Sequence, residues 1–324
     1  MGIYSYLIIF VLLIISELIY ISIARRFKIG NEVTPRSSHK EFKVSGGGII
    51  FSISLILFHI LYHGSVPNTY HIMLIGACIL ALISFYDDIK NSAPWFRLTL
   101  HIIVVALLFK QLMFNGYYDV FLLLLICGVG FINAFNFMDG INGILTGYTL
   151  VTLISLLYYS YHVPVIYIDF FQSFIIVLII ATVVFGFFNF RKNAVCFSGD
   201  VGSIVMGFFI LYLVSEFILS TGNASIIIFL IVYAIDSVFT IFQRLFAGEN
   251  IFQSHRLHLY QILANQCNIT HYKIALFYSM IQLGINIGYL IISDELKWTY
   301  FIVITITLTI LYFIIKRILN KVSK

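Results

Sequence analysis

The chain has 324 residues, of which 61% are hydrophobic and 10% are charged, and its formal net charge at pH 7 is +5. A soluble domain carries about 25% charged residues, so this composition excludes an ordinary soluble globular protein and the disordered classes. With a mean hydropathy of +1.01, the chain is expected to form a single integral membrane domain over residues 1–324.

Eleven apolar runs are long enough to cross a bilayer, which predicts an all-α polytopic membrane protein with about eleven transmembrane helices. They lie near residues 3–23, 46–63, 69–85, 96–113, 118–136, 142–161, 167–188, 201–220, 224–242, 272–292 and 298–316. Nothing in the sequence resembles an internal repeat.

The cationic residues predict the orientation of these spans. Of the 19 Lys and Arg, 17 fall in loops on one side, and Lys110 and Lys297 fall toward the other. The positive-inside rule therefore predicts a periplasmic N-terminus and a cytoplasmic C-terminus in a bacterial inner membrane. The basic balance needs no nucleic acid partner, because anionic lipid headgroups and an anionic substrate account for it.

The first predicted cytoplasmic loop, 24–45, is basic, and three glycines at 46–48 open the next span. Consecutive glycines let backbone N–H groups approach an anion at a helix N-terminus, with Lys43 close by. A flexible loop with a helix-packing glycine run explains these residues equally well.

The second loop, 86–96, contains the adjacent acids Asp87 and Asp88. Adjacent helical residues do not share a face, so one is expected to meet a metal or a substrate phosphate while the other orients a neighbour. Capping of a helix or contact with solvent is the alternative.

The third loop, 136–143, follows a polar stripe in which Asn133, Asn136 and Asp139 are spaced by three residues. Such a stripe can hydrogen-bond a uracil edge and a ribose while facing away from lipid. Polar contact between membrane helices explains the asparagines, but not the acid in the glycine-rich DGINGI that follows.

The fourth loop, 189–200, ends in a turn that contains Phe197, Gly199 and Asp200 and is followed by Ser203. The glycine allows close approach of a diphosphate, Asp200 can hold Mg²⁺, and Phe197 offers a face for a base. A role as helix N-cap would explain Asp200 and little else.

The fifth loop, 243–271, places His255 and His258 three residues apart with Arg256 between them. This spacing predicts a cationic or hydrogen-bonding patch for phosphate oxygens, and a zinc site would need a third ligand that the stretch lacks. Asp236, in the preceding span, is expected to face the protein interior, with Arg244 as a candidate partner.

Acids from three separate loops thus share one membrane face. Carboxylates at that depth are costly unless they are hydrogen-bonded or bound to a cation. The clustering favours a shared metal or phosphate site.

Five motifs along the chain carry a resemblance to a known family. RSSH with GGG, FYDD, NAFNFMDGINGI, FSGDVGS and HRLHLYQ resemble, in order and placement, those of the polyprenyl-phosphate N-acetylhexosamine-1-phosphate transferases of glycosyltransferase family 4. The HLYQ ending resembles the branch that initiates O-antigen or related glycans, whereas the pentapeptide translocase branch has a multi-histidine loop.

The resemblance implies a transferase that moves a sugar 1-phosphate from a UDP-activated N-acetylhexosamine to undecaprenyl phosphate and releases UMP at the cytoplasmic face. This reaction is the first membrane step of O-antigen, and so of lipopolysaccharide, or of a related cell-envelope glycan. The implied cofactor is Mg²⁺, with Mn²⁺ as a substitute, and the partners are the UDP-sugar, undecaprenyl phosphate and membrane lipid. A homodimer is left open.

The matching motifs also imply residue roles. Asp200 and Asp88 would hold the metal, and Asp87 and Asp88 would serve the lipid phosphate. His255, Arg256 and His258 would contact the diphosphate or the sugar as catalytic groups. The nucleotide sugar would be held by Lys43, Asn133, Asn136, Asp139, Asn189, Phe197, Gly199 and Ser203. Ser45 and Asn142 depart from the family pattern, which has Arg and an acid at these places.

Two mechanisms and two other classes of protein stay open at this point. The lipid phosphate is anionic near neutral pH, so direct attack in one displacement is the preferred mechanism, and an aspartyl-phosphate intermediate at Asp87 or Asp88 is its competitor. A secondary transporter would place its acids near the membrane midplane in repeated halves. A structural scaffold would not need the acids to cluster.

Overall fold

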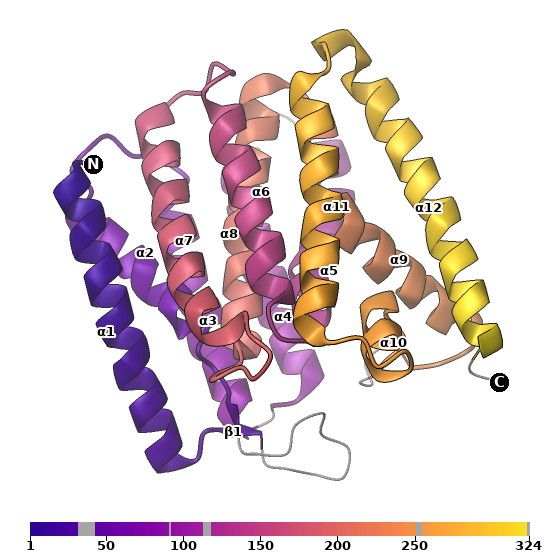
Figure 1. The fold of residues 1–324 in the computed structure, drawn as a ribbon. Coiled ribbons are helices and arrows are strands. Elements are labelled where there is room, and N and C mark those ends of the chain that lie inside the picture. The colour runs from indigo at the N-terminus through magenta and orange to yellow at the C-terminus, as the bar shows by residue number, and fades with distance from the viewer. Residues whose placement is uncertain (32–42, 91, 113–117, 251–254, 323–324) are drawn as a thin grey trace.

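The computed structural model describes residues 1–31, 43–90, 92–112, 118–250 and 255–322, which form a bundle of helices (Figure 1). The helices are α1 (Ile3–Phe27), α2 (Ile49–Leu61), α3 (Tyr70–Lys90), α4 (Pro94–Leu112), α5 (Phe121–Phe137), α6 (Ile144–Ser160), α7 (Ile168–Asn189), α8 (Gly199–Thr221), α9 (Ile231–Phe246), α10 (Leu259–Asn265), α11 (His271–Ile291) and α12 (Lys297–Val322). Three short 3-10 helices, η1 (Tyr118–Val120), η2 (Ala224–Leu230) and η3 (Asp294–Leu296), precede α5, α9 and α12. The strands β1 (Gly30–Asn31) and β2 (Lys43–Val44) pair antiparallel. The RSSH motif at 36–39 lies outside the described residues.

The helices confirm an all-helical, multi-span membrane protein. Among the described residues, eight helical segments are long and apolar enough to cross a bilayer. The other three predicted spans correspond to the shorter apolar helices α2, α5 and α6. At about 1.5 Å per residue, the 13 residues of α2 cover roughly 20 Å, less than the ~30 Å hydrocarbon core. The count of eleven crossings therefore stays a prediction.

Helix α8 forms the centre of the bundle and packs against α2, α3 and α5. In its most apolar stretch 78% of the residues are buried, compared with 6% for α12, which stands at the edge in Figure 1. A helix that is apolar on all sides is stable where other helices surround it. The N-terminus of α8, which carries Asp200, is therefore held from several directions.

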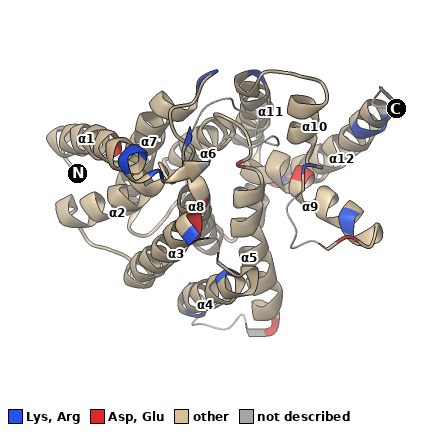
Figure 2. Ribbon diagram, turned by 90° about the horizontal axis from the view of Figure 1, so that it is seen from below, with Lys and Arg blue, Asp and Glu red and all other residues tan. Residues whose placement is uncertain are grey.

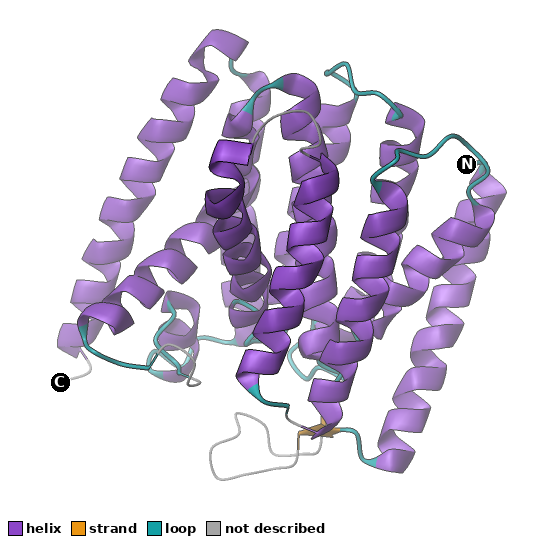
Figure 3. Cartoon of the chain, turned by 180° about the vertical axis from the view of Figure 1, so that it is seen from behind, coloured by secondary structure: helices purple, strands orange, loops and turns teal. Residues whose placement is uncertain are grey.

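The two chain ends lie at opposite ends of the bundle. Figure 3 shows the β1–β2 pair and the C-terminus at one end and the N-terminus at the other. An odd number of crossings requires this arrangement. Figure 2 looks onto the end with the strands and shows acidic and basic positions together where α3 and α8 meet.

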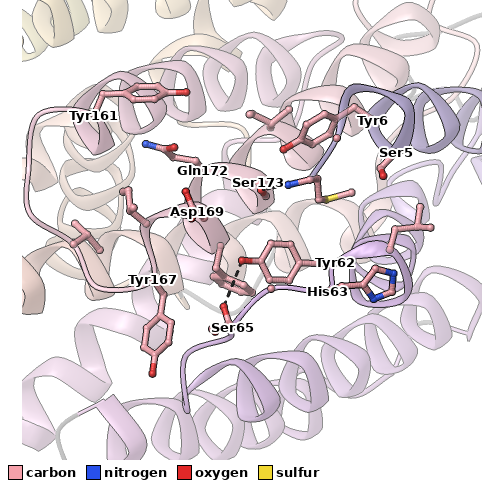
Figure 4. Close-up of a pocket in the computed structure, with 18 residues that line it drawn as sticks. Ser5, Tyr6, Tyr62, His63, Ser65, Tyr161, Tyr167, Asp169, Gln172 and Ser173 are labelled. Atoms are coloured by element: carbon pink, nitrogen blue, oxygen red, sulfur yellow. Dashed lines mark hydrogen bonds between the residues drawn. The ribbon is translucent and has the colours of Figure 1, made fainter.

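A cavity of about 850 Å³ lies at the opposite end, between α1, α2, α7 and the connection from α6 to α7 (Figure 4). Its walls include the side chains of Tyr6, Tyr62, His63, Asp169 and Ser173. None of the described residues that line it is Lys or Arg. The cavity therefore lies apart from the predicted phosphate site.

Candidate active site

Asp200 lies in the first turn of α8 and meets side chains from two other helices. Its Oδ1 accepts a hydrogen bond from Asn136 Nδ2 at 2.8 Å, and its Oδ2 accepts one from Arg97 Nη1 at 2.5 Å. The Asn136 amide also donates to the hydroxyl of Ser203, one turn further along α8, at 3.1 Å. The third and fourth motifs therefore meet at Asp200, together with Arg97 from α4.

Arg97, at the start of α4, joins two carboxylates. The nitrogen Nη1 that contacts Asp200 also donates to Asp87 Oδ2 at 2.6 Å. Asp87 is buried, and its Oδ1 accepts from both the backbone N–H and the hydroxyl of Ser92, at 2.5 and 2.6 Å. A buried carboxylate needs such partners, because water no longer solvates its charge.

Asp88 faces a different group, the backbone N–H groups in the first turn of α8, which have no acceptor within the helix. Its two oxygens accept hydrogen bonds from the N–H groups of Asp200 at 2.9 Å and Val201 at 3.1 Å. A carboxylate in this place also interacts favourably with the positive end of the helix dipole. Gly199 has φ +69°, and a Cβ there would overlap the Asp88 carboxylate, so this position requires glycine.

The glycine run has a structural role that differs from the expected one. The N–H groups of Gly47 and Gly48 donate to the carbonyls of Phe197 and Ser198, at 2.8 and 2.9 Å. They are therefore taken by protein acceptors, and the prediction that they approach an anion is wrong for these two groups. Lys43 lies beside them in β2 and is partly exposed.

Asp139 is partly buried in the turn between α5 and α6, where its Oδ2 accepts a hydrogen bond from the Ser198 hydroxyl. Burial raises the pKa of the Asp139 carboxyl to about 8, although the Ser198 hydrogen bond opposes this shift. The charges of Asp200 and Asp88 raise this pKa further. At pH 7 and without a bound cation, Asp139 is therefore mainly protonated.

Three asparagines predicted at or near the site make protein contacts. The Asn133 amide donates to the Val129 carbonyl at 2.8 Å, one turn from Asn136. Buried Asn189 accepts from Gly143 N–H at 2.8 Å and donates to the Cys196 carbonyl at 2.9 Å. The Asn142 amide donates to the carbonyls of Arg191 and Lys192 at 3.3 and 3.2 Å. Asn189 and Asn142 thus tie the third loop to the fourth.

The fifth motif packs against the third. The Tyr260 hydroxyl donates to the Phe137 carbonyl at 2.8 Å, and the ring of buried His258 stacks toward Phe137 with centroids 6.5 Å apart. His255 lies beside His258, with ring centroids 4.8 Å apart. Burial, with the charges of His258 and Arg244, lowers the pKa of His255 to about 4, so this imidazole is neutral near pH 7.

Asp236 faces the interior, as expected, but its partner differs from the candidate. Its Oδ1 lies 3.5 Å from His258 Nδ1, whereas Arg244 pairs with Glu249 at 2.9 Å. Arg256 is exposed. Within the fifth motif, His258 is therefore the buried member and Arg256 the accessible one.

Sequence reasoning missed two residues that organise this site. Arg97 entered only as a cation on the predicted cytoplasmic side, although its position ten residues after Asp87 on that side was a usable signal. Ser198, which contacts Asp139 and Gly48, lies inside the FSGDVGS motif, but its partners are far away in sequence and no local pattern identifies them.

Comparisons with known proteins agree with this geometry. Residues 70–218 match the model of glycosyl transferase family 4, a range that runs from α3 into α8 and includes Asp87, Asp139 and Asp200. A phospho-N-acetylmuramoyl-pentapeptide-transferase of Dictyoglomus thermophilum is 28% identical over 224 residues, which cover 62% of this chain and 69% of that protein. These matches confirm the resemblance inferred from the five motifs. Residues 70–218 of the chain are therefore similar to glycosyl transferase family 4.

Proposed function

We propose that the protein transfers a sugar 1-phosphate from a UDP-activated N-acetylhexosamine to undecaprenyl phosphate and releases UMP. The observation that carries this proposal is the meeting of Asp87, Asp88, Asp139 and Asp200 with Arg97 around the N-terminus of α8. Phosphoryl transfer depends mainly on aligned charges of this kind. The named relative, a phospho-sugar transferase, supports the same reaction class.

The proposed pathway and orientation follow from the sequence. The HLYQ ending favours initiation of O-antigen or a related surface glycan, and the cation distribution favours eleven spans with the site on the cytoplasmic face of a bacterial inner membrane. The opposite placement of the two chain ends is compatible with this topology.

The donor chemistry of the site fits a divalent cation. Asp87 and Asp200 direct one carboxylate oxygen each at the same Arg97 nitrogen, which supports a positive centre shared by the two acids. Carboxylate and amide oxygens are the ligands that Mg²⁺ prefers. Asp200 and Asp88, with Asp87 beside them, would hold it, and it would supply charge neutralisation for the phosphate groups. Among the described residues there is no group of three or more His, Cys, Asp or Glu preformed for a metal.

The contacts of the two adjacent acids favour direct attack by the lipid phosphate. Arg97 and Ser92 hold the oxygens of Asp87, and α8 holds those of Asp88. A carboxylate that must act as a nucleophile would first have to leave these partners. The lipid phosphate carries its own negative charge near neutral pH, so no protein nucleophile is needed. Arg97 and Asn136 would orient the reacting groups.

A secondary transporter is the competing class. It would require acids near the middle of the membrane. Here the four clustered acids belong to the ends of helices at one end of the bundle, which supports a surface reaction.

The test is release of UMP from a panel of UDP-N-acetylhexosamines by the purified protein in detergent. Activity is expected with one or more of these donors and only when undecaprenyl phosphate is added. The same panel is run on proteoliposomes for uptake of the sugar nucleotide. Uptake without UMP release would favour the transporter, and no response to the lipid acceptor would contradict the proposal.

A further inference from the structure

Asp236 is a buried acid at the centre of a hydrogen-bond network between α9, α10 and α11. The residue is 2% exposed, and it lies in a segment that is long and apolar enough to cross a membrane. It accepts hydrogen bonds from four donors: the backbone N–H groups of Leu259 (2.9 Å) and Tyr260 (3.4 Å) and the hydroxyls of Tyr278 (2.8 Å) and Thr240 (3.3 Å). The carboxylate therefore caps the N-terminus of α10, the helix that follows His258.

The same carboxylate also faces the imidazole of His258. Nδ1 of His258 lies 3.5 Å from Asp236 Oδ1, and the His258 side chain is 1% exposed. Nδ1 makes no hydrogen bond at this distance, and the other nitrogen, Nε2, is also buried and has no hydrogen-bond partner among the residues that the structure describes. A buried imidazole nitrogen is costly without a partner, so this atom is suited to a group that the protein binds.

His258 lies close to the predicted nucleotide-sugar site. Its ring stacks toward Phe137, two residues before Asp139, and the neighbouring Tyr260 donates to the Phe137 carbonyl. The pair formed by Asp236 and His258 thus connects the interior of α9 with the turn that carries Asp139.

We propose that Asp236 is a positioning residue for the transfer reaction, which it serves by fixing the His258 imidazole; this rests on the function proposed above. A carboxylate on Nδ1 selects the tautomer with the proton on that nitrogen and sets the orientation of the ring. Nε2 is then presented to the donor diphosphate, and the carboxylate stabilises the imidazole when it is protonated and donates from Nε2. Asp236 itself does not touch the substrate.

Asp236→Asn preserves the volume of the side chain and places an amide against Nδ1. The expected result is a fall in kcat of about 10²-fold, since a misoriented imidazole loses its contact with developing charge. KM for the UDP-sugar should change by less than about threefold, because ground-state binding does not depend on this contact. The matched control is Glu216→Gln, the same chemical change at a partly buried acid of α8 that pairs with Thr69, and it should leave the kinetics unchanged.

A double-mutant cycle separates positioning from a structural role. If Asp236 acts through His258, adding Asp236→Asn to His258→Ala should cost less than about twofold beyond His258→Ala alone. If the fold-losses in kcat of the two single variants multiply in the double variant, the two residues act independently, and the proposal would be overturned. Wild-type protein that releases no UMP would instead contradict the proposed function and remove the reaction that this role serves.

Leu259→Pro covers the case in which Asp236→Asn does not fold. Proline at the first position of α10 removes one capping donor to Asp236, and the extended backbone of His258 (φ −62°, ψ 145°) accepts a following proline. Activity within about fivefold of wild type is expected, because the pair with His258 stays intact. A loss as large as that of His258→Ala would show that capping alone explains Asp236 and would overturn the proposal.

Discussion

Asp87 and Asp88 are adjacent in sequence, yet their carboxylates have different partners. Asp87 pairs with Arg97, and Asp88 accepts the first N–H groups of α8. Asp88 holds the backbone of Asp200, and the expected division of roles between the two acids stays a prediction. Asp200 is therefore positioned through its backbone by Asp88 and through its side chain by Arg97 and Asn136.

Asp200→Asn should reduce transfer by at least about 10²-fold, since it removes the charge that the proposed site directs at a cation. The fold should stay intact because the backbone N–H of residue 200 still donates to Asp88. UMP release and thermal unfolding are measured on the same sample. Asp169→Asn, at the cavity at the opposite end, is the control. Activity near wild type at ordinary Mg²⁺ would remove Asp200 from the site.

The raised pKa of Asp139 predicts how stability depends on pH. The pKa of Asp139 is about 8 in the folded state and about 4 in an unfolded chain. The stabilising contribution of this carboxyl to the free energy of unfolding is therefore fully present below about pH 4. The contribution is lost as the pH rises through 8. In EDTA, the Tm of the wild type should fall between pH 6 and 9 more steeply than that of Asp139→Asn, which cannot ionise. Parallel curves would show that Asp139 does not titrate in this range.

At the scale of elements, the fourth loop and α8 are held by close backbone contacts. A Cβ added to Gly48 would overlap the Cα of Gly202, so the start of α2 lies directly against α8. The same contact aligns the glycine run with Phe197 and Ser198. The two glycines thus permit an approach between α2 and α8 that no larger residue would allow.

Gly48→Ala is therefore expected to destabilise the protein by about 1–3 kcal/mol, the usual cost of overpacking against an atom that cannot move. Gly130→Ala in α5 is the matched control, because nothing lies within 4 Å of its added Cβ. That control should be neutral or stabilising by up to about 1 kcal/mol, through helix propensity. Thermal unfolding in detergent compares the two, and equal melting temperatures would refute the close contact.

The sequence predicted the positions of the helices better than it predicted the contacts between the helices and between the motifs. The apolar runs marked every long helix, because hydrophobic length is a local property. The pair of buried Glu17 and Cys196, at 3.2 Å, joins α1 to the fourth loop across 179 positions, and no local pattern announces it. Likewise, the glycine run gave the correct place for a close approach, but its partners are the loop before α8 and α8 itself, and not an anion.

At the scale of the whole molecule, the prediction is that the strands, α10 and the acidic cluster face the cytoplasm. Native Cys267, which is exposed, lies at this end, and exposed Ser65 lies at the cavity at the opposite end. In a background without Cys78 and Cys127, an impermeant maleimide should label Cys267 only from the cytoplasmic side. A cysteine at position 65 should be labelled only from outside. The reverse pattern would overturn the orientation.

The central claim is transfer of the sugar together with its phosphate. The direct measurement uses a UDP-sugar with a radioactive β-phosphate, incubated with the protein, Mg²⁺ and undecaprenyl phosphate. The proposed reaction leaves the label in the lipid product and releases unlabelled UMP, and Asp200→Asn should leave the label in the donor. Label recovered in free UDP, with unlabelled sugar on the lipid, would contradict sugar 1-phosphate transfer.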